Sequence, residues 1–256
     1  MSRLKKLFEN KKSGILNIYC TAGYPETEST IDIMKALQDA GADIIELGIP
    51  YSDPIADGPV IQESSKKAIA GGMSIPELFR QLKDFRKSIH IPVVLMGYLN
   101  PVLQYGVENF CKSAAECGVD GIILPDLPLW EYESEYKEIL KKYHLDFIFL
   151  ITPNTSDERI KLLDKAGSGF LYAVSTSATT GSDISGKTTM SYFEKLKTMK
   201  LNNPVLIGFG IKDKASFDNA CKYAAGAIIG TAFIKSIQKN KDINKATTAF
   251  VQSIKN

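Results

Sequence analysis

Short apolar runs rich in β-branched residues alternate with longer segments of helical periodicity along all 256 residues, and this alternation constrains the fold most. Strict alternation predicts a parallel sheet with right-handed crossovers, and eight such units most often close into a (β/α)8 TIM barrel. An open, doubly wound α/β sheet is the main competing architecture. The eight candidate strands are residues 15–21, 44–48, 92–96, 121–124, 146–150, 170–174, 205–208 and 227–229.

A weak internal repeat supports the same fold. The phrases DAGADIIELG (39–48), ECGVDGIILP (116–125) and KAGSGFLYAV (165–174) each join a helix end to a strand through a glycine. We expect this glycine to adopt the left-handed conformation that ends a helix, after which the apolar run enters the sheet. No linker or low-complexity tract divides the chain, so we interpret residues 1–256 as one domain.

Local signals predict where several helices begin. Leu4, Leu7 and Phe8 have helical spacing, which indicates a short N-terminal helix docked on the barrel. Capping boxes are expected at Ser74 with Glu77 and at Thr155 with Glu158, and Asp213 is expected to cap the helix after it. Extra short helices are expected in the loops that follow the strands.

Composition and charge argue against several classes of protein. The formal net charge of +2 is small and evenly spread, which argues against nucleic acid as a partner. No apolar run approaches the roughly 20 residues needed to span a bilayer, and the N-terminal segment has no apolar signal core, so we expect a cytoplasmic protein. The 4 cysteines lack paired spacing and the 2 histidines lie far from them, which predicts reduced thiols and no metal site.

The second candidate strand carries an unusual acidic residue. Side chains alternate along a strand, so Glu46 shares a face with Ile44 and Gly48, while Ile45 and Leu47 occupy the face that meets the helices. Glu46 is therefore predicted to point into the barrel near its catalytic end. Burial would raise its pKa toward values useful for proton transfer. Pairing with a buried cation is the alternative, but the inward positions of the other strands offer no obvious cation.

Two aspartates follow this strand, in the segment PYSDPIADGP at residues 50–59. The segment could be no more than a rigid, proline-rich loop. However, Asp53 and Asp57 are predicted to lie above Glu46, and two carboxylates in different surroundings are a recurring acid–base arrangement.

Glycine-bearing loops come late in the chain, at residues 176–186, 208–210 and 230–233. Each glycine alone could be an ordinary turn residue. Together they occupy positions where barrels of this kind bind phosphate, with backbone N–H groups exposed at a helix start, and so they favour a phosphorylated substrate.

The longest motif, ELGIPYSDPIADGPVIQ at residues 46–62, resembles the signature of the tryptophan synthase alpha chain family. Shorter matches follow in the family's order and cover nearly the whole chain. They are TAGYP at 21–25, MGYLNP at 96–101, GIILPDLP at 121–128, TPN at 152–154 and GFGI at 208–211.

The resemblance implies roles for particular residues. Glu46 and Asp57 match the family's catalytic glutamate and aspartate, and Asp53 resembles the position that faces the beta subunit. The positions around the indole ring correspond to Tyr19, Ile61, Met96, Tyr98, Ile123 and Tyr172. The phosphate-binding loops correspond to Thr180, Gly181, Phe209, Gly210, Gly230 and Thr231. Plain barrel core is the alternative for the apolar members, above all for Ile123 and Met96.

The resemblance also implies an activity and a partner. The expected reaction is the retro-aldol cleavage of indole-3-glycerol phosphate to indole and D-glyceraldehyde 3-phosphate, with no metal and no organic cofactor in this chain. The expected partner is a beta subunit, which would hold pyridoxal phosphate, in an alpha2-beta2 heterotetramer. The alternatives are another phosphate-binding barrel enzyme and a non-catalytic subunit that only activates a beta chain.

One segment departs from the family pattern. Thr176 and Ala178 stand where the family more commonly has other residues, although Thr180 and Gly181 are retained. Residues 176–188 are rich in Ser, Thr and Gly without apolar periodicity, so we expect a mobile lid over the site.

Overall fold

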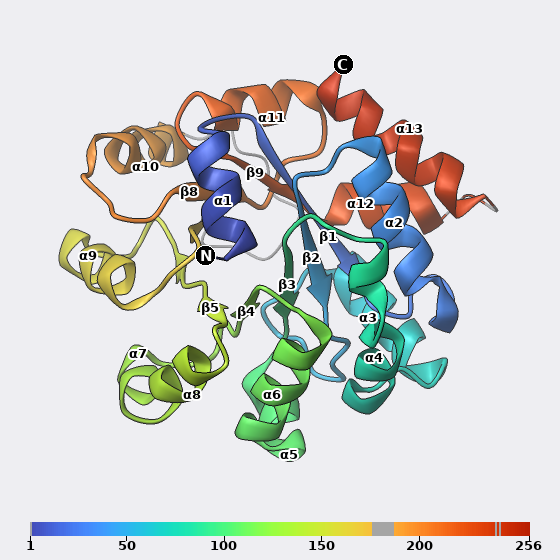
Figure 1. Cartoon of the computed structure of the whole chain (residues 1–256). Helices are drawn as coiled ribbons and strands as arrows, with labels where there is room; N and C mark the ends of the chain where they lie inside the picture. Colours follow the sequence, from blue (N-terminus) through green and yellow to red (C-terminus); the bar gives the residue numbers. More distant parts are fainter. Residues whose placement is uncertain (1, 176–186, 239, 241) are drawn as a thin grey trace.

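Figure 1 shows helices arranged in a ring around a curled parallel sheet, in a computed structural model that describes residues 2–175, 187–238, 240 and 242–256. Within these residues the sheet has nine strands in the order β5-β4-β3-β2-β1-β9-β8-β7-β6, and every pairing is parallel. The strands are β1 Ile15–Thr21, β2 Ile44–Gly48, β3 Val93–Met96, β4 Gly121–Ile123, β5 Asp146–Phe147, β6 Leu150–Ile151, β7 Leu171–Val174, β8 Val205–Gly208 and β9 Gly226–Ile229.

Helices follow the strands around the ring, as strict alternation predicts. The described helices are α1 Arg3–Asn10, α2 Thr30–Ala40, α3 Pro59–Ala70, α4 Ile75–Leu82, α5 Leu99–Tyr105, α6 Val107–Cys117, α7 Leu129–Glu131, α8 Lys137–Lys142, α9 Asp157–Ala166, α10 Lys187–Thr198, α11 Lys214–Cys221, α12 Thr231–Gln238 and α13 Ile243–Lys255. Short single turns at Thr27–Ser29, Phe85–Lys87 and Tyr132–Tyr136 complete them. Across the described parts of the chain, no helix is long and apolar enough to cross a membrane.

The predicted strands are confirmed to within one residue at every boundary except in the fifth, which is divided. Residues 146–147 pair with β4 as β5, and residues 150–151 pair with β7 as β6. Hydrogen bonds continue through the division, from Ile148 N–H to the Ile122 carbonyl at 3.0 Å and from Tyr172 N–H to the Phe149 carbonyl at 3.0 Å. The divided strand thus contacts both neighbours and closes the barrel. The prediction of one uninterrupted strand was wrong because the two halves of this segment pair with different neighbouring strands.

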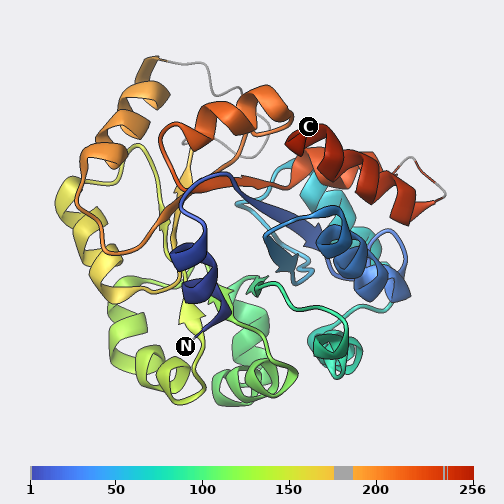
Figure 2. The ribbon, with the colours of Figure 1, turned by 45° about the horizontal axis from the view of Figure 1, so that its top comes forward.

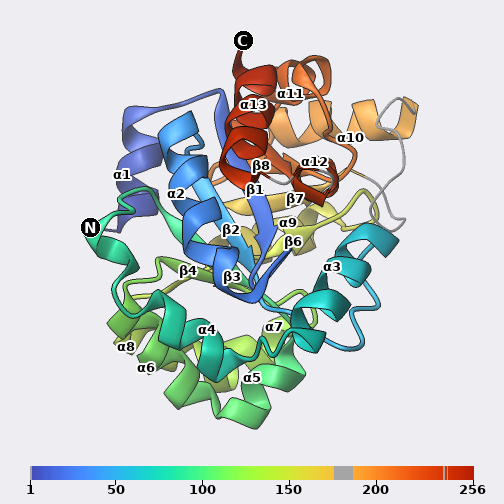
Figure 3. The same cartoon turned by 90° about the vertical axis from the view of Figure 1, so that its right-hand side faces the viewer.

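Two apolar layers hold the barrel together. Ile45 and Leu47 belong to the layer between sheet and helices, whereas Ile44 belongs to a separate cluster inside the barrel. Helix α1 lies across one end of the barrel in Figures 2 and 3, and its buried Leu4 and Phe8 join the inner cluster. The predicted N-terminal helix is therefore confirmed. It closes the end from which the strands begin and leaves the other end for a binding site.

The glycines of the internal repeat behave in two ways. Gly41 and Gly118 end α2 and α6 in the left-handed conformation, with φ of 98° and 89°, as predicted. Gly167 ends α9 with φ −83° and extended backbone, so a left-handed conformation was wrong there. Glycine is required instead by crowding, since an added Cβ would lie 3.0 Å from the Phe147 carbonyl oxygen and 3.2 Å from that of Leu163.

Helix starts follow the predicted caps with one shift. The Ser74 side chain accepts a hydrogen bond from Glu77 N–H at the start of α4, and Asp213 caps α11 in the same way through Ser216 N–H. At α9 the cap is Ser156, one residue later than predicted. The Thr155 hydroxyl is used instead to accept from Thr152 N–H at 3.0 Å, which closes the preceding turn.

Candidate active site

Glu46 points into the barrel from β2, as its strand parity predicts. It is paired in register with Tyr19 of β1 and Val94 of β3, and only 1% of the residue is exposed. One carboxyl oxygen, Oε2, accepts a hydrogen bond from the Asn17 side-chain amide at 2.9 Å. The other oxygen, Oε1, is buried and has no hydrogen-bond partner among the described residues. Burial raises the pKa of Glu46 to about 8, against the opposing effect of the Asn17 hydrogen bond. Glu46 is therefore mostly a neutral acid at pH 7.

Asp57 lies at the end of the loop that leads from β2 into α3. Burial raises the pKa of its carboxyl group to about 6, while a hydrogen bond with the Tyr98 hydroxyl acts in the opposite direction. The Tyr98 hydroxyl also accepts a hydrogen bond from Ala56 N–H at 3.2 Å, so one tyrosine holds both residues of the loop. Asp57 is therefore mostly ionised at pH 7, and the two carboxyl groups differ in charge.

Asp53 is not part of this pair. It is exposed, and its carboxylate accepts a hydrogen bond from the neighbouring Ser52 hydroxyl at 2.5 Å. Of the two aspartates predicted to lie above Glu46, only Asp57 lines the cavity with it.

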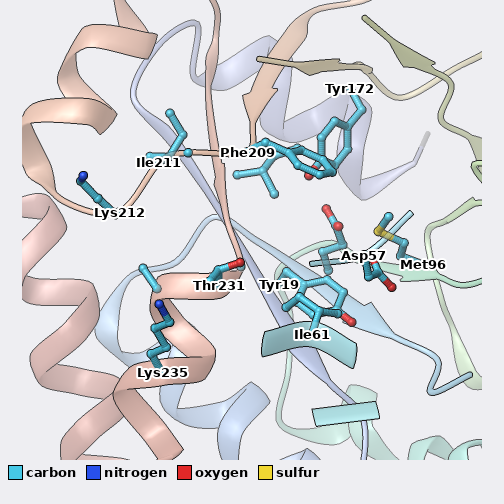
Figure 4. Close-up of a pocket in the computed structure, with 15 residues that line it drawn as sticks. Tyr19, Asp57, Ile61, Met96, Tyr172, Phe209, Ile211, Lys212, Thr231 and Lys235 are labelled. Carbon is cyan, nitrogen blue, oxygen red and sulfur yellow. The ribbon is translucent and has the colours of Figure 1, made fainter. Parts of the chain in front are cut away.

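A cavity of about 280 Å³ joins the carboxyl groups to the late glycine loops. Figure 4 shows the aromatic side chains, Met96 and Asp57 on one side, with Thr231 and two lysines toward the other. Its lining includes these residues from the predicted set: Tyr19, Glu46, Asp57, Ile61, Met96, Tyr172, Phe209, Gly210, Gly230 and Thr231. One end of the cavity can thus take a flat apolar group and the other a polar one.

Two glycines allow the cavity tyrosines to lie flat against neighbouring strands. A Cβ added at Gly48 would lie 2.1 Å from the Tyr19 hydroxyl oxygen, and one added at Gly208 would lie 2.4 Å from the Tyr172 ring. No side chain could occupy either position without displacing a ring. Burial raises the pKa of both tyrosines well above the usual value, so both remain neutral walls of the site.

The loop after β8 has a strained backbone beside the cavity. Phe209 has φ 66° and Gly210 has φ 76°, a conformation that is unusual for phenylalanine. The buried Ser175 hydroxyl donates a hydrogen bond of 2.6 Å to the Phe209 carbonyl oxygen, and this bond holds the peptide in place. The Phe209 ring then contacts Tyr172 edge to face, with ring centroids 6.0 Å apart.

The loop after β9 leads directly into α12, whose first residue is Thr231. The first N–H groups of a helix have no partner within it, and Gly230 offers no side chain to block their approach by an anion. Lys212 and Lys235 also line this end of the cavity, and Figure 4 shows both on this side. The arrangement suits a phosphate group.

Two described residues of the predicted set, Tyr98 and Ile123, do not line the cavity. Tyr98 lies behind Asp57, with its ring 5.1 Å from that of Tyr51. Ile123 is fully buried in the inner cluster and is paired in register with Met96. Thr180 and Gly181, with the predicted lid and its unusual Thr176 and Ala178, lie outside the described residues except for the first turn of α10.

Sequence reasoning missed Asn17, Ser175, Lys212 and Lys235. Asn17 was detectable, because it lies two residues before Tyr19 on a strand and therefore shares its inward face. Lys235 lies four residues after Thr231, on the same face of α12. Ser175 gave no signal, because its partner is a backbone carbonyl 34 residues later.

A neutral acid and a carboxylate share an apolar pocket at the carboxyl ends of the strands. The fold and this pocket therefore define the protein as a TIM-barrel enzyme that uses acid–base chemistry. Comparisons with known proteins identify the family. The family model for the tryptophan synthase alpha chain matches residues 4–256. The tryptophan synthase alpha chain of Parabacteroides distasonis is 48% identical over 256 residues, which cover 100% of both chains. That of Flavobacterium johnsoniae is 51% identical over 242 residues, 94% of this chain and 95% of the relative.

Solved structures agree with the sequence relatives. Tryptophan synthase subunit alpha from Legionella pneumophila is 35% identical, with a TM-score of 0.89 over 99% of this chain and 97% of that chain. A chain of tryptophan synthase from M. tuberculosis is 29% identical, with a TM-score of 0.87 over 99% of this chain and 98% of that chain. This protein belongs to the tryptophan synthase alpha chain family.

Proposed function

We propose that the chain cleaves indole-3-glycerol phosphate into indole and D-glyceraldehyde 3-phosphate, as the alpha subunit of a tryptophan synthase. One observation carries the proposal: a buried and a partly buried carboxyl group, in different protonation states, lie at the apolar end of a cavity that ends at glycine loops. Family membership supplies the substrate, and the cavity supplies chemistry that fits it.

Glu46 is the proposed proton shuttle. As a neutral acid it donates its proton to indole C3, which turns the ring into a leaving group and gives a carboxylate. The carboxylate then removes the proton of the adjacent glycerol hydroxyl. The bond from C3 to the glycerol chain breaks, its electron pair returns to the ring, and an aldehyde forms. Glu46 is neutral again at the end. A pKa of about 8 suits both directions of transfer near neutral pH.

Asp57 is the proposed partner of the ring nitrogen. Protonation of C3 places positive charge on the indole, and an ionised carboxylate that accepts the N1–H hydrogen bond stabilises this charge. A pKa of about 6 keeps Asp57 ionised while Glu46 is still protonated. Tyr98 acts through Asp57, because its hydroxyl holds the aspartate and the adjoining Ala56.

The remaining cavity residues would hold the two ends of the substrate. Tyr19, Ile61, Met96 and Tyr172 offer an apolar slot for the indole ring. At the other end, the N–H groups of Gly210, Gly230 and Thr231, beside Phe209, can bind the phosphate. Binding energy from this remote group then positions the reacting bond. Ile123 would support the slot from behind, and Thr180 and Gly181 would cover it.

The proposed steps use only carboxyl groups, and so the reaction needs no cofactor in this chain. We propose a cytoplasmic alpha2-beta2 heterotetramer in which the beta subunit carries pyridoxal phosphate and receives the indole. The similarity to a chain of a solved tryptophan synthase supports a beta partner. Exposed Asp53, on the loop that holds Asp57, is proposed to face that partner.

The test is a product assay with the isolated chain and indole-3-glycerol phosphate, followed by the same assay with a beta subunit but no serine. We expect indole and glyceraldehyde 3-phosphate in equal amounts in both, with faster release in the second. A folded chain that stimulates a beta subunit yet releases no indole would instead be a non-catalytic activator. A chain that leaves the substrate unchanged in both assays would have another barrel activity.

A further inference from the structure

Asn17 is a buried polar residue that the mechanism above does not use. It lies on β1, it is fully buried, and its side chain shares the inward face with Tyr19. Its amide nitrogen donates to Glu46 Oε2 at 2.9 Å, while no described residue forms a hydrogen bond with its own carbonyl oxygen, Oδ1. An asparagine inside an apolar barrel is costly unless it is hydrogen-bonded. Here only half of the side chain is satisfied, and the satisfied half contacts Glu46.

The hydrogen bond makes the two oxygens of Glu46 different. Oε2 accepts from an N–H group, and Oε1 has no hydrogen-bond partner within the described part of the chain. When the carboxyl group is neutral, its proton cannot sit between Oε2 and the amide N–H without a clash of two hydrogens. The proton therefore belongs on Oε1, and Oε1 is the oxygen available for exchange with a substrate.

We propose that Asn17 is a positioning residue for the reaction: it fixes the Glu46 side chain through Oε2 and so assigns the transferable proton to Oε1. This inference rests on the proposed function, in which Glu46 is the shuttle. Asn17 also stabilises the carboxylate that forms halfway through the reaction, because its N–H donates to the charged form.

The other groups that face Glu46 do not perform this task. Asp57 repels a charged Glu46 and so raises its pKa, in the same direction as burial. Tyr19 of β1, Cys20 of β1 and Tyr172 of β7 are coupled electrostatically to Glu46, and each has a pKa raised mainly by burial. These three groups stay neutral, and within the described part of the chain none of them forms a hydrogen bond with Glu46. Asn17 supplies the interaction that lowers the pKa of Glu46.

Asn17→Leu is the central variant, because leucine has nearly the same size and removes the amide without leaving a large void. We expect kcat to fall about 10-fold at pH 7 with little change in KM, since Asn17 does not line the cavity. We also expect the basic limb of the kcat–pH profile to move upward by about one pH unit, because the carboxylate loses its donor. A purely structural role would lower the amount of folded enzyme without moving the profile.

Two further variants keep the test decisive. Ile18→Val, on the opposite face of the same strand, is the matched control for weaker packing and should leave the profile in place. Asn17→Asp keeps the size of the side chain if Asn17→Leu fails to fold. It should also lower kcat and move the basic limb upward, because a second carboxyl group disfavours ionisation of Glu46. Wild-type kcat and an unmoved profile in either folded Asn17 variant would overturn the inference. Absence of indole release by the unmodified chain would instead count against the proposed function.

Discussion

Buried carboxyl groups occur at both ends of the barrel, and their surroundings differ sharply. Asp120, where the strands begin, is 4% exposed and bound by two cations. The Arg86 guanidinium contacts one of its oxygens, Arg3 of α1 contacts the other at 3.0 Å, and Val93 N–H donates at 2.8 Å. Glu46, where the strands end, is 1% exposed and accepts a hydrogen bond from one neutral donor among the residues described, Asn17.

The difference separates a structural carboxylate from a reactive one. Burial of a charge is tolerated when paired cations and donors replace the lost water, as at Asp120. Glu46 lacks such partners among the described residues. It therefore keeps its proton, because losing the proton would leave a buried and poorly stabilised charge. The lesson is that burial alone says little about function. The number and charge of the partners decide whether a buried acid holds the fold or exchanges protons.

The largest expected effect is on catalysis. Glu46→Gln preserves the shape of the side chain but removes the proton shuttle, so indole release should fall by about 10²–10⁴-fold. Stability at pH 7 should rise by on the order of a few kcal/mol relative to wild type, because wild type must bind a proton at Glu46 to fold at this pH and the amide needs none. Steady-state kinetics and urea unfolding on the same preparation measure both. Turnover like that of the unmodified chain would remove Glu46 from the mechanism and leave the two carboxyl groups functionally alike.

The reverse outcome is expected at the other end. Asp120→Ala leaves Arg86 half-buried without its carboxylate and releases Arg3, which ties α1 to the barrel. We expect a loss of about 3–5 kcal/mol in the free energy of unfolding, while kcat per folded molecule is retained. Asp218→Ala is the matched control, because its pairing with Lys214 is exposed and should contribute less than about 1 kcal/mol. If Asp120→Ala abolished catalysis in a fully folded chain, the claim that Asp120 has only a structural role would be wrong.

The sequence predicts a feature at either end of the barrel when the residues that determine it are close together in the chain. The inward orientation of Glu46 is predictable because strand parity depends only on neighbouring residues, and the eight-unit alternation predicts the barrel for the same reason. The division of the fifth strand depends on two different neighbouring strands, which single-sequence periodicity does not encode. Asp120 was overlooked, since Arg3 and Arg86 lie 117 and 34 residues away from it. Tyr98 was assigned to the indole pocket by resemblance alone, and its contact with Ala56, 42 residues earlier, gives no signal in the sequence.

The smallest expected effect is a pH dependence of stability that belongs to one carboxyl group. The pKa of Glu46 is about 8 in the folded chain and near the ordinary 4.5 when unfolded. Between these values the folded state holds a proton that the unfolded state has lost, so the free energy of unfolding falls as pH rises. The contribution is complete below about pH 4.5 and is lost as pH passes through about 8.

Urea unfolding of wild type and Glu46→Gln from pH 5 to pH 9 tests this dependence. Glutamine does not titrate, so the stability of the variant relative to wild type should increase by on the order of a few kcal/mol and then level off above about pH 8. Asp57 adds a similar pH dependence of stability at lower pH, since its pKa is raised to about 6. The same measurement on Asp57→Asn gives the contribution of Asp57 by itself. Parallel curves for wild type and Glu46→Gln would mean that Glu46 is ionised throughout. Its site would then solvate a charge as well as the two arginines solvate Asp120, and the neutral acid that donates the first proton would have to be another group.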